Sequence, residues 1–356
     1  MTMHDVLKRA MTHRLFWPLV TLALLLAANA VLNPGFLRLQ WRDGHLYGSL
    51  IDILNRAAPL MLVAVGMTLV VATRGIDISV GATVAISAAV AALMIGGQLV
   101  IVDGVPTHVS RFPMWAAIGA ALAVGAAAGL WNGLLVAKVG MQPIIATLIL
   151  MVAGRGIAQL LTNGQIITIY YAPYFFIGNG YLLGLPFALF IAAAVWAVLH
   201  VALTRTALGL FIQAIGINPQ AARVAGVRSR LITVGAYVFC GVAAAMAGLL
   251  ISSNVKSADG NNAGLLLELD AILAVTLGGT LLNGGRFSLA GSVIGALIIQ
   301  TLTSTIYSIG VPPEVNLVVK AAVVFVVMLL QSAEFRAAIR RWVVRPAAGA
   351  ERGWPC

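Results

Sequence analysis

Long apolar runs with almost no charge constrain this chain more than any other feature of its sequence. A helix needs roughly 20 mostly apolar residues to cross the hydrocarbon core of a bilayer. Runs that meet this requirement, some of them interrupted, are found at 15–32, 57–73, 80–96, 114–137, 143–161, 185–203, 231–252, 266–282, 287–309 and 317–330. We therefore predict an all-α membrane protein with about ten transmembrane helices.

The composition agrees with this prediction. Of the 356 residues, 61% are hydrophobic and only 9% are charged, whereas a soluble domain carries about a quarter charged residues. So few charges could not cover a surface that faces water. The 37 glycines suit membrane helices, which pack closely on small residues. We expect lipid to surround most of the chain.

The distribution of basic residues predicts the orientation. A net charge of +11 could suggest nucleic acid, but the Lys and Arg residues flank the apolar runs. With ten spans, most of them fall on the side of the N-terminus, as the positive-inside rule predicts. We expect a cytoplasmic N-terminal segment at 1–14, a transmembrane domain at 15–332 and a basic cytoplasmic tail at 333–356. Residues 8–30 also resemble a signal peptide, although their apolar run is longer than usual.

Two glycine-rich segments, 74–81 and 278–286, interrupt the helical pattern. Non-helical backbone inside a membrane is tolerated only where protein or water satisfies its polar groups. A pair of such segments, one in each half of the chain, indicates a transport pathway. Alternatively, both segments are simple turns at the cytoplasmic side. Both interpretations stay open at this point.

The sequence carries no motif for ATP hydrolysis or other catalysis. A phosphate-binding loop ends in Gly-Lys followed by Ser or Thr, and none of the four lysines follows a glycine. A His-Glu-x-x-His metal motif and a Gly-x-Ser-x-Gly nucleophile motif are also missing from the sequence. We predict that the chain is no enzyme and holds no metal or cofactor. If ATP drives it, a partner binds ATP and Mg²⁺.

The connection at 204–230 differs from its surroundings, with four arginines and an Asn-Pro turn signal. Asn218 and Pro219 predict the start of a short helix, and Gly226 predicts its end. Small residues would let this helix enter a groove on a partner. The alternative is an ordinary cytoplasmic loop. The residues that we expect to couple the chain to a partner ATPase are Asn218, Gln220, Ala221, Ala222, Arg223 and Gly226.

Residues 220–226 resemble the Glu-Ala-Ala-x-x-x-Gly signature of importer permeases, with Gln220 in place of the Glu. Together with the motifs at 76–81, 214–218 and 268–272, they make the chain from 15 to 332 similar to the ribose-type branch of bacterial ABC sugar importer permeases. Within that branch it most resembles the galactofuranose permeases. The stretches that carry this closer resemblance are 51–59, 146–159, 259–273 and 312–320.

This resemblance implies a multi-pass protein of the bacterial inner membrane. It also implies three partners: a cytoplasmic ATP-binding subunit, a periplasmic sugar-binding protein and a second permease protomer, identical or different. The expected activity is passage of a monosaccharide, such as galactofuranose, into the cytoplasm.

Polar residues within the spans are costly and usually face a partner or water. Two interpretations are open for such residues in this chain. They line the sugar path or a gate, or they form a buried ion pair, such as Arg155 with Glu268, that fixes helix register. We favour the ion pair for these two residues. Sugar recognition points to amide side chains, including Asn132 beside Trp131. The candidates for the path or gate are Asp77, Ser79, Asn132, Gln142, Arg155, Asn262, Glu268, Asp270 and Asn316.

Two other transport classes remain as alternatives. In an ion-coupled secondary transporter, Asp52, Asp77, Glu268 and Asp270 would bind protons or sodium. A passive channel would need neither ion sites nor ATP. The connection at 204–230 favours an ATP-driven importer, since the two alternatives have no use for a docking loop.

Overall fold

The computed structural model describes residues 15–42, 44–102, 105–310, 312–331 and 335. The chain forms two compact units that divide after Thr301. The helices of the first unit are α2 (Phe16–Leu32), α3 (Ser49–Ala72), α4 (Val80–Ile95), α5 (Met114–Leu134), α6 (Pro143–Thr162), α7 (Ala172–Asn179), α8 (Phe187–Arg205), α9 (Leu208–Ile217), α10 (Pro219–Val224), α11 (Ser229–Val255) and α12 (Leu267–Leu277). Helix α13 (Leu289–Ser308) crosses the division, and α14 (Pro313–Gln331) belongs to the second unit.

The predicted helical membrane protein is confirmed, whereas the number of spans stays a prediction. Within the described residues, six helices are long and apolar enough to cross a bilayer. They are Ser49–Ala72, Met114–Val139, Pro143–Leu161, Phe187–Arg205, Ser229–Val255 and Leu289–Ser308. Shorter apolar helices, among them α2 and α4, occupy other predicted spans. Residues 1–14 and nearly all of 333–356, on which the cytoplasmic termini were predicted, lie outside the described part.

The interrupted run at 266–282 is helical only in its first part. Helix α12 covers Leu267–Leu277, 11 residues, and ends where the glycine-rich segment 278–286 was predicted to interrupt the helical pattern. At 1.5 Å per residue it is about 16 Å long, roughly half of the hydrocarbon core. Its end at Gly278 and Gly279 has a physical reason, because Gly279 adopts a left-handed φ of 82° that ends a helix.

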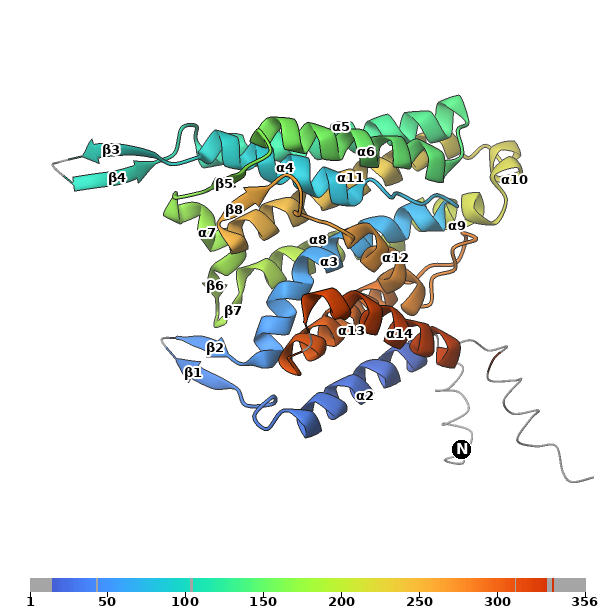
Figure 1. Ribbon diagram of the computed structural model, residues 1–356. Coiled ribbons are helices and arrows are strands. Elements are labelled where there is room, and N and C mark those ends of the chain that lie inside the picture. Colours follow the sequence, from blue (N-terminus) through green and yellow to red (C-terminus); the bar gives the residue numbers. More distant parts are fainter. Residues whose placement is uncertain (1–14, 43, 103–104, 311, 332–334, 336–356) are drawn as a thin grey trace, which may run out of the picture. The chain divides into compact units, whose positions relative to one another are not determined.

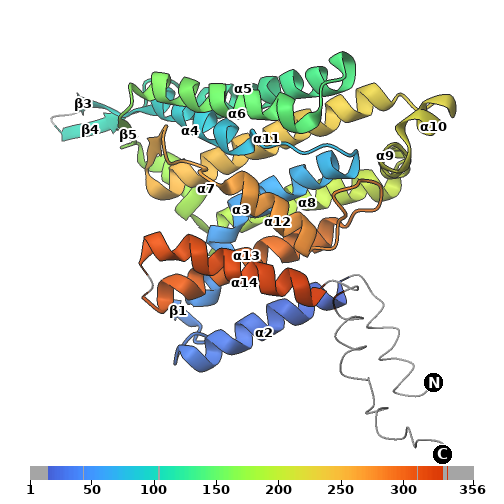
Figure 2. The same cartoon turned by 45° about the vertical axis from the view of Figure 1, so that its right-hand side comes forward.

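Four short antiparallel strand pairs occupy connections between helices. They are β1 (Gln40–Arg42) with β2 (His45–Tyr47), β3 (Gln98–Val102) with β4 (Val105–Val109), β5 (Ile166–Thr168) with β8 (Ser257–Asp259), and β6 (Tyr181–Leu182) with β7 (Leu185–Pro186). Both views place these pairs at one end of the first unit and α9 and α10 at the other (Figures 1 and 2).

Helix α11 lies at the centre of the first unit, against α3, α4 and α5. Its contacts depend on glycines. Gly241 of α11 meets Gly125 of α5 backbone to backbone, and a Cβ on Gly129 of α5 would collide with the Tyr237 carbonyl. Likewise, Gly248 lies on the backbone carbonyl of Val84 in α4. Such close approach is how membrane helices gain packing contact where lipid removes the hydrophobic drive.

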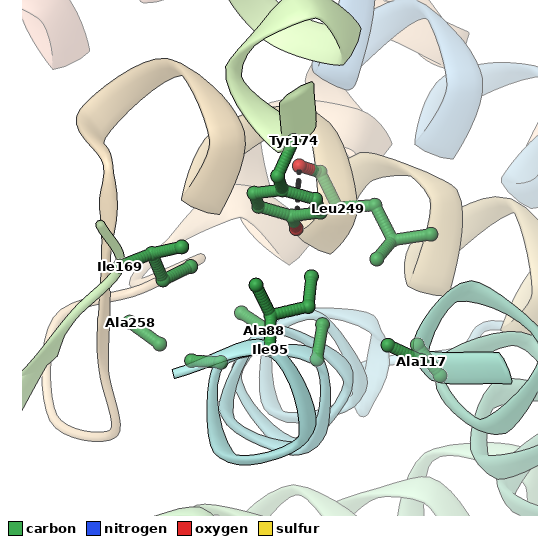
Figure 3. Packing of buried hydrophobic residues seen from close by; sticks show 10 residues of the cluster. Ala88, Ile95, Ala117, Ile169, Tyr174, Leu249 and Ala258 are labelled. Carbon is green, nitrogen blue, oxygen red and sulfur yellow. Dashed lines mark hydrogen bonds between the residues drawn. The ribbon is translucent and has the colours of Figure 1, made fainter. Parts of the chain in front are cut away.

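A buried apolar cluster closes the end of the unit that carries the strand pairs. Figure 3 shows Ile95 at the end of α4 between Ala117 of α5, Ile169 and Tyr174. The hydroxyl of Tyr174 donates a hydrogen bond to the carbonyl of Leu249 in α11 at 3.2 Å. This bond satisfies the one polar atom of an otherwise apolar side chain. The cluster therefore joins α4, α5, α7 and α11 into one packed layer.

Candidate functional site

The first predicted helix break, between α3 and α4, contains a buried hydrogen-bond network. The Asp77 Oδ1 atom accepts from the Ser79 hydroxyl at 2.6 Å and from the Ser79 N–H at 3.0 Å. The Asn132 amide of α5 donates to the Ser79 Oγ at 2.8 Å and to Asp77 Oδ1 at 3.3 Å. All three residues are at most 1% exposed. Asp77, Ser79 and Asn132 thus lie together, but their hydrogen bonds tie α4 to α5.

Neighbouring helices hold the backbone of this break. The Ile76 carbonyl accepts from Tyr237 of α11 at 3.5 Å and from Thr147 of α6 at 3.4 Å. Gly75 makes room for the Tyr237 hydroxyl, which a Cβ there would overlap. Arg74, with a left-handed φ of 65°, donates from Nε to the Gly216 carbonyl of α9 at 2.6 Å. Sequence reasoning missed these roles of Tyr237, Thr147 and Arg74. Nothing in their spacing indicates that the first two bind the Ile76 carbonyl or that Arg74 binds the Gly216 carbonyl.

The second predicted break, which follows α12, lies against the first. The Gly285 N–H donates to the carbonyl of Ala72 at 2.9 Å. A Cβ on Gly284 would meet the Arg74 side chain, and one on Gly216 would meet both Ala72 and Gly285. The two glycine-rich segments therefore form one junction with the C-terminal end of α9. This shared contact was not predictable from either segment alone.

A third non-helical segment, 256–266, connects α11 to α12. It includes β8, at the end of the unit that carries the strand pairs, and leads back to α12 (Figure 1). Arg155 of α6 holds it. Nη1 of this guanidinium donates to the carbonyls of Ala263, Asn261 and Gly260 at 2.7, 3.2 and 3.5 Å. A charged side chain inside a span therefore donates hydrogen bonds to main-chain carbonyls that are not bonded within a helix.

Glu268, in the first turn of α12, is 2% exposed. Its carboxylate lies on Gly81 at the start of α4, where any Cβ would overlap Oε2. Among the described residues, Oε2 has no hydrogen-bond partner, and no ion pair joins Glu268 to Arg155. The predicted buried ion pair is therefore wrong in this structure, because backbone carbonyls take the guanidinium hydrogen bonds. The two opposite charges still attract each other through space.

The remaining path candidates are spread over several elements. Asn262 is exposed in the 256–266 segment and donates to Asp259 at 2.7 Å. Gln142 precedes α6 and is exposed without a capping bond, and Asp270 is partly exposed on α12. Asn132 is buried, whereas the neighbouring Trp131 is 55% exposed, so this pair shares no face. The side chain of Asn316 lies outside what the structure describes.

The coupling loop has the predicted local structure. The Asn218 side chain accepts from the N–H groups of Gln220 and Ala221 at 3.0 and 3.1 Å, so it caps α10. Beyond the helix, Gly226 has a φ of 85° and ends the turn. Ala222 is buried, whereas Gln220, Ala221, Arg223 and Gly226 are exposed, and Val224 is 91% exposed. The helix thus presents one free face at its end of the unit.

A helical membrane protein with a pair of glycine-rich helix breaks, one in each half of the chain, fits a transporter. The chain belongs to the family described as branched-chain amino acid transport system / permease component, which matches residues 49–328. Within the described part, no cluster of three or more His, Cys, Asp or Glu could hold a metal ion.

Curated relatives cover nearly the whole chain. The galactofuranose transporter permease protein YtfT of Escherichia coli (strain K12) is 48% identical over 332 residues, 92% of this chain and 94% of that protein. The fructose import permease protein FruF of Bifidobacterium longum (strain NCC 2705) is 37% identical and covers 92% and 90%. The ribose import permease protein RbsC of Escherichia coli (strain K12) is 35% identical and covers 88% and 92%. No solved structure matches the chain.

Proposed function

We propose that the chain is the transmembrane permease subunit of an ATP-driven sugar importer and that it passes a monosaccharide into the cytoplasm. The observation that carries this proposal is the 48% identity to a galactofuranose permease over 92% of the chain. The other two relatives compared above are also named as sugar import permeases. Galactofuranose is the sugar that this comparison favours.

The polar residues of the site fit a neutral, hydroxyl-rich solute. Asn261, Asn262 and Asp259 lie together on the 256–266 segment, where the Asp259 carboxylate binds the Asn261 N–H at 2.8 Å and the Asn262 amide. An amide can donate to or accept from a hydroxyl group, and a carboxylate can accept from one. We place the sugar path along this segment and the first turn of α12, next to Arg155.

The proposed partners follow from the same comparison. A cytoplasmic ATP-binding subunit would bind ATP and Mg²⁺ and dock on α10, a periplasmic binding protein would deliver the sugar, and a second permease protomer would complete the path in the bacterial inner membrane. The free face of α10 supports docking, because Val224 is almost fully exposed. An ion-coupled transporter is less well supported, since Asp77 already accepts three hydrogen bonds within the protein.

The test is uptake in proteoliposomes that contain the chain, its cognate ATPase and its binding protein, with labelled galactofuranose, ribose and fructose. We expect ATP-dependent uptake that persists when a protonophore collapses the proton gradient. Val224→Asp should abolish uptake without a change in melting temperature, because the side chain contacts little of its own chain. Val255→Asp, at the far end of α11 and also exposed, is the matched control. Uptake that follows the proton gradient and ignores ATP would overturn the proposal.

A further inference from the structure

The segment 256–266 has a backbone that its neighbours must hold in place. Non-Gly residues in the left-handed region mark both of its ends, Lys256 at φ 58° and Leu266 at φ 61°. Such residues occur where surrounding structure imposes the conformation. Between them, Gly260 packs on the Ala158 carbonyl of α6, and Gly264 packs on the Gly81 carbonyl of α4. The segment therefore lies in a slot between two helices.

Arg155 is the polar attachment of this segment to α6. Its three carbonyl partners, at 260, 261 and 263, belong to one run of turns that follows β8. Without the guanidinium these carbonyls would lose hydrogen bonds in a site that is only partly open to water. Hydrogen bonds to a charged donor are among the stronger ones in proteins.

Glu268 is the attachment of the start of α12 to α4. The carboxylate occupies the space that Gly81 leaves free, and its Oε2 lacks a hydrogen bond among the described residues. Steric fit holds this side chain in place. Arg155 thus attaches the segment by hydrogen bonds and Glu268 attaches the helix that follows it by shape, while Asn261 and Asn262 are exposed.

We propose that Arg155 is a positioning residue for import: it holds the backbone at 260–263 so that Asn261 and Asn262 face the transported sugar. The assignment rests on the proposed function, since it takes the 256–266 segment as part of the path. Arg155 itself needs no contact with the sugar. Its role differs from that of an ion-pair partner because its hydrogen bonds go to main-chain oxygens.

The hydrogen bonds of Arg155 predict which substitutions at this position keep the segment attached. All three bonds start from a single nitrogen, Nη1. A Lys ammonium carries three N–H donors on one nitrogen, so Arg155→Lys should keep the attachment. Arg155→Met keeps an unbranched side chain but is shorter and has no donor, so it should lose the attachment. Glu268→Gln still fits against Gly81 and should not compensate for Arg155→Met.

The experiment measures the position of the segment directly. In a Cys356→Ser background, where the remaining Cys240 is buried, Asn262→Cys is labelled with a membrane-impermeant methanethiosulfonate in the complete transporter in proteoliposomes. Uptake and melting temperature are measured on the same Arg155 variants without the reporter cysteine. Gly156→Ala is the matched control, because a Cβ there meets nothing within 4 Å.

We expect Arg155→Met to change the labelling rate and to lower uptake by on the order of tenfold or more, the factor that a lost charged hydrogen bond supplies. Arg155→Lys and Gly156→Ala should behave like the parent. If Arg155→Met does not fold, Arg155→Gln, which retains donors but not the reach, should fold and show altered labelling.

Three results would overturn the assignment: parental labelling and uptake in Arg155→Met, equal loss in Arg155→Lys and Arg155→Met, or restored uptake in the double variant with Glu268→Gln. The last would establish an ion pair. Failure of the parent complex to import any of the three sugars is a different result. It contradicts the proposed function, whereas the labelling rates still test whether Arg155 holds the segment.

Discussion

The contact between α5 and α11 should not tolerate a single added methyl group. A Cβ at Gly241 would overlap the Gly125 carbonyl and would lie 2.9 Å from the Gly129 nitrogen. Both neighbours are backbone atoms, so no side chain can rotate away. Carbon atoms in contact prefer separations of about 3.5–4.0 Å, and one whole helix must therefore move in Gly241→Ala.

The expected cost follows from overpacking. Inserting a methyl group into a packed interior typically costs about 1–3 kcal/mol, and here the shift also weakens other contacts along the same helix pair. Gly235 is the matched control on the same helix, because a Cβ there meets nothing within 4 Å. Gly235→Ala should be neutral or should stabilise the protein by up to about 1 kcal/mol, since Ala favours the helix over Gly.

The assay is thermal unfolding of the detergent-solubilised protein at one fixed scan rate, because irreversible unfolding makes the midpoint depend on rate. We expect Gly241→Ala to unfold at a clearly lower temperature than the parent and Gly235→Ala at the same temperature or higher. Equal midpoints for the two variants would refute the argument that α5 and α11 touch through their backbones.

Two further predictions concern the buried network and the topology. Asn132→Ala removes two donors from Asp77 and Ser79 and should destabilise the protein by about 1–3 kcal/mol, seen as a lower melting temperature, whereas exposed Gln142→Ala should not. A higher or unchanged midpoint in Asn132→Ala would contradict the network. Reporter domains inserted after Gly226 and at Thr107 should report opposite sides of the membrane, because α10 and β4 lie at opposite ends of the first unit. If both reporters lie on the same side, the predicted number of membrane crossings between Thr107 and Gly226 is wrong.

Features that depend on neighbours in the sequence were predictable. The apolar runs located the helices, because each span must satisfy its backbone internally. Asn218, Pro219 and Gly226 predicted α10 and its ends, since capping involves residues only two to four positions apart. The end of α12 at Leu277 was also predictable, because the glycines of the segment 278–286 interrupt the helical pattern there.

Contacts between distant segments were not predictable in the same way. Arg155 and Glu268 suggested an ion pair, because charged residues can be identified in a sequence. Main-chain carbonyls that are free to accept a hydrogen bond cannot. Because 256–266 is not helical, carbonyls of this segment are left to accept hydrogen bonds from the guanidinium. Similarly, Asp77 and Asn132 each looked like isolated polar residues in a path, and only the approach of α4 to α5 shows that they bind each other.

The glycine contacts of α11 also determine which parts of the protein can move. Two helices that touch through main-chain atoms cannot slide or tilt by rearranging side chains, so we expect α4, α5 and α11 to move as a single rigid body. The segment 256–266 is attached in two ways, through the hydrogen bonds of the Arg155 guanidinium and through Gly260 and Gly264, which pack on carbonyls of α6 and α4. On the proposed path, we expect an opening for a solute to separate this segment and the short helix α12 from that rigid body, which requires both the Arg155 hydrogen bonds and the glycine contacts to break.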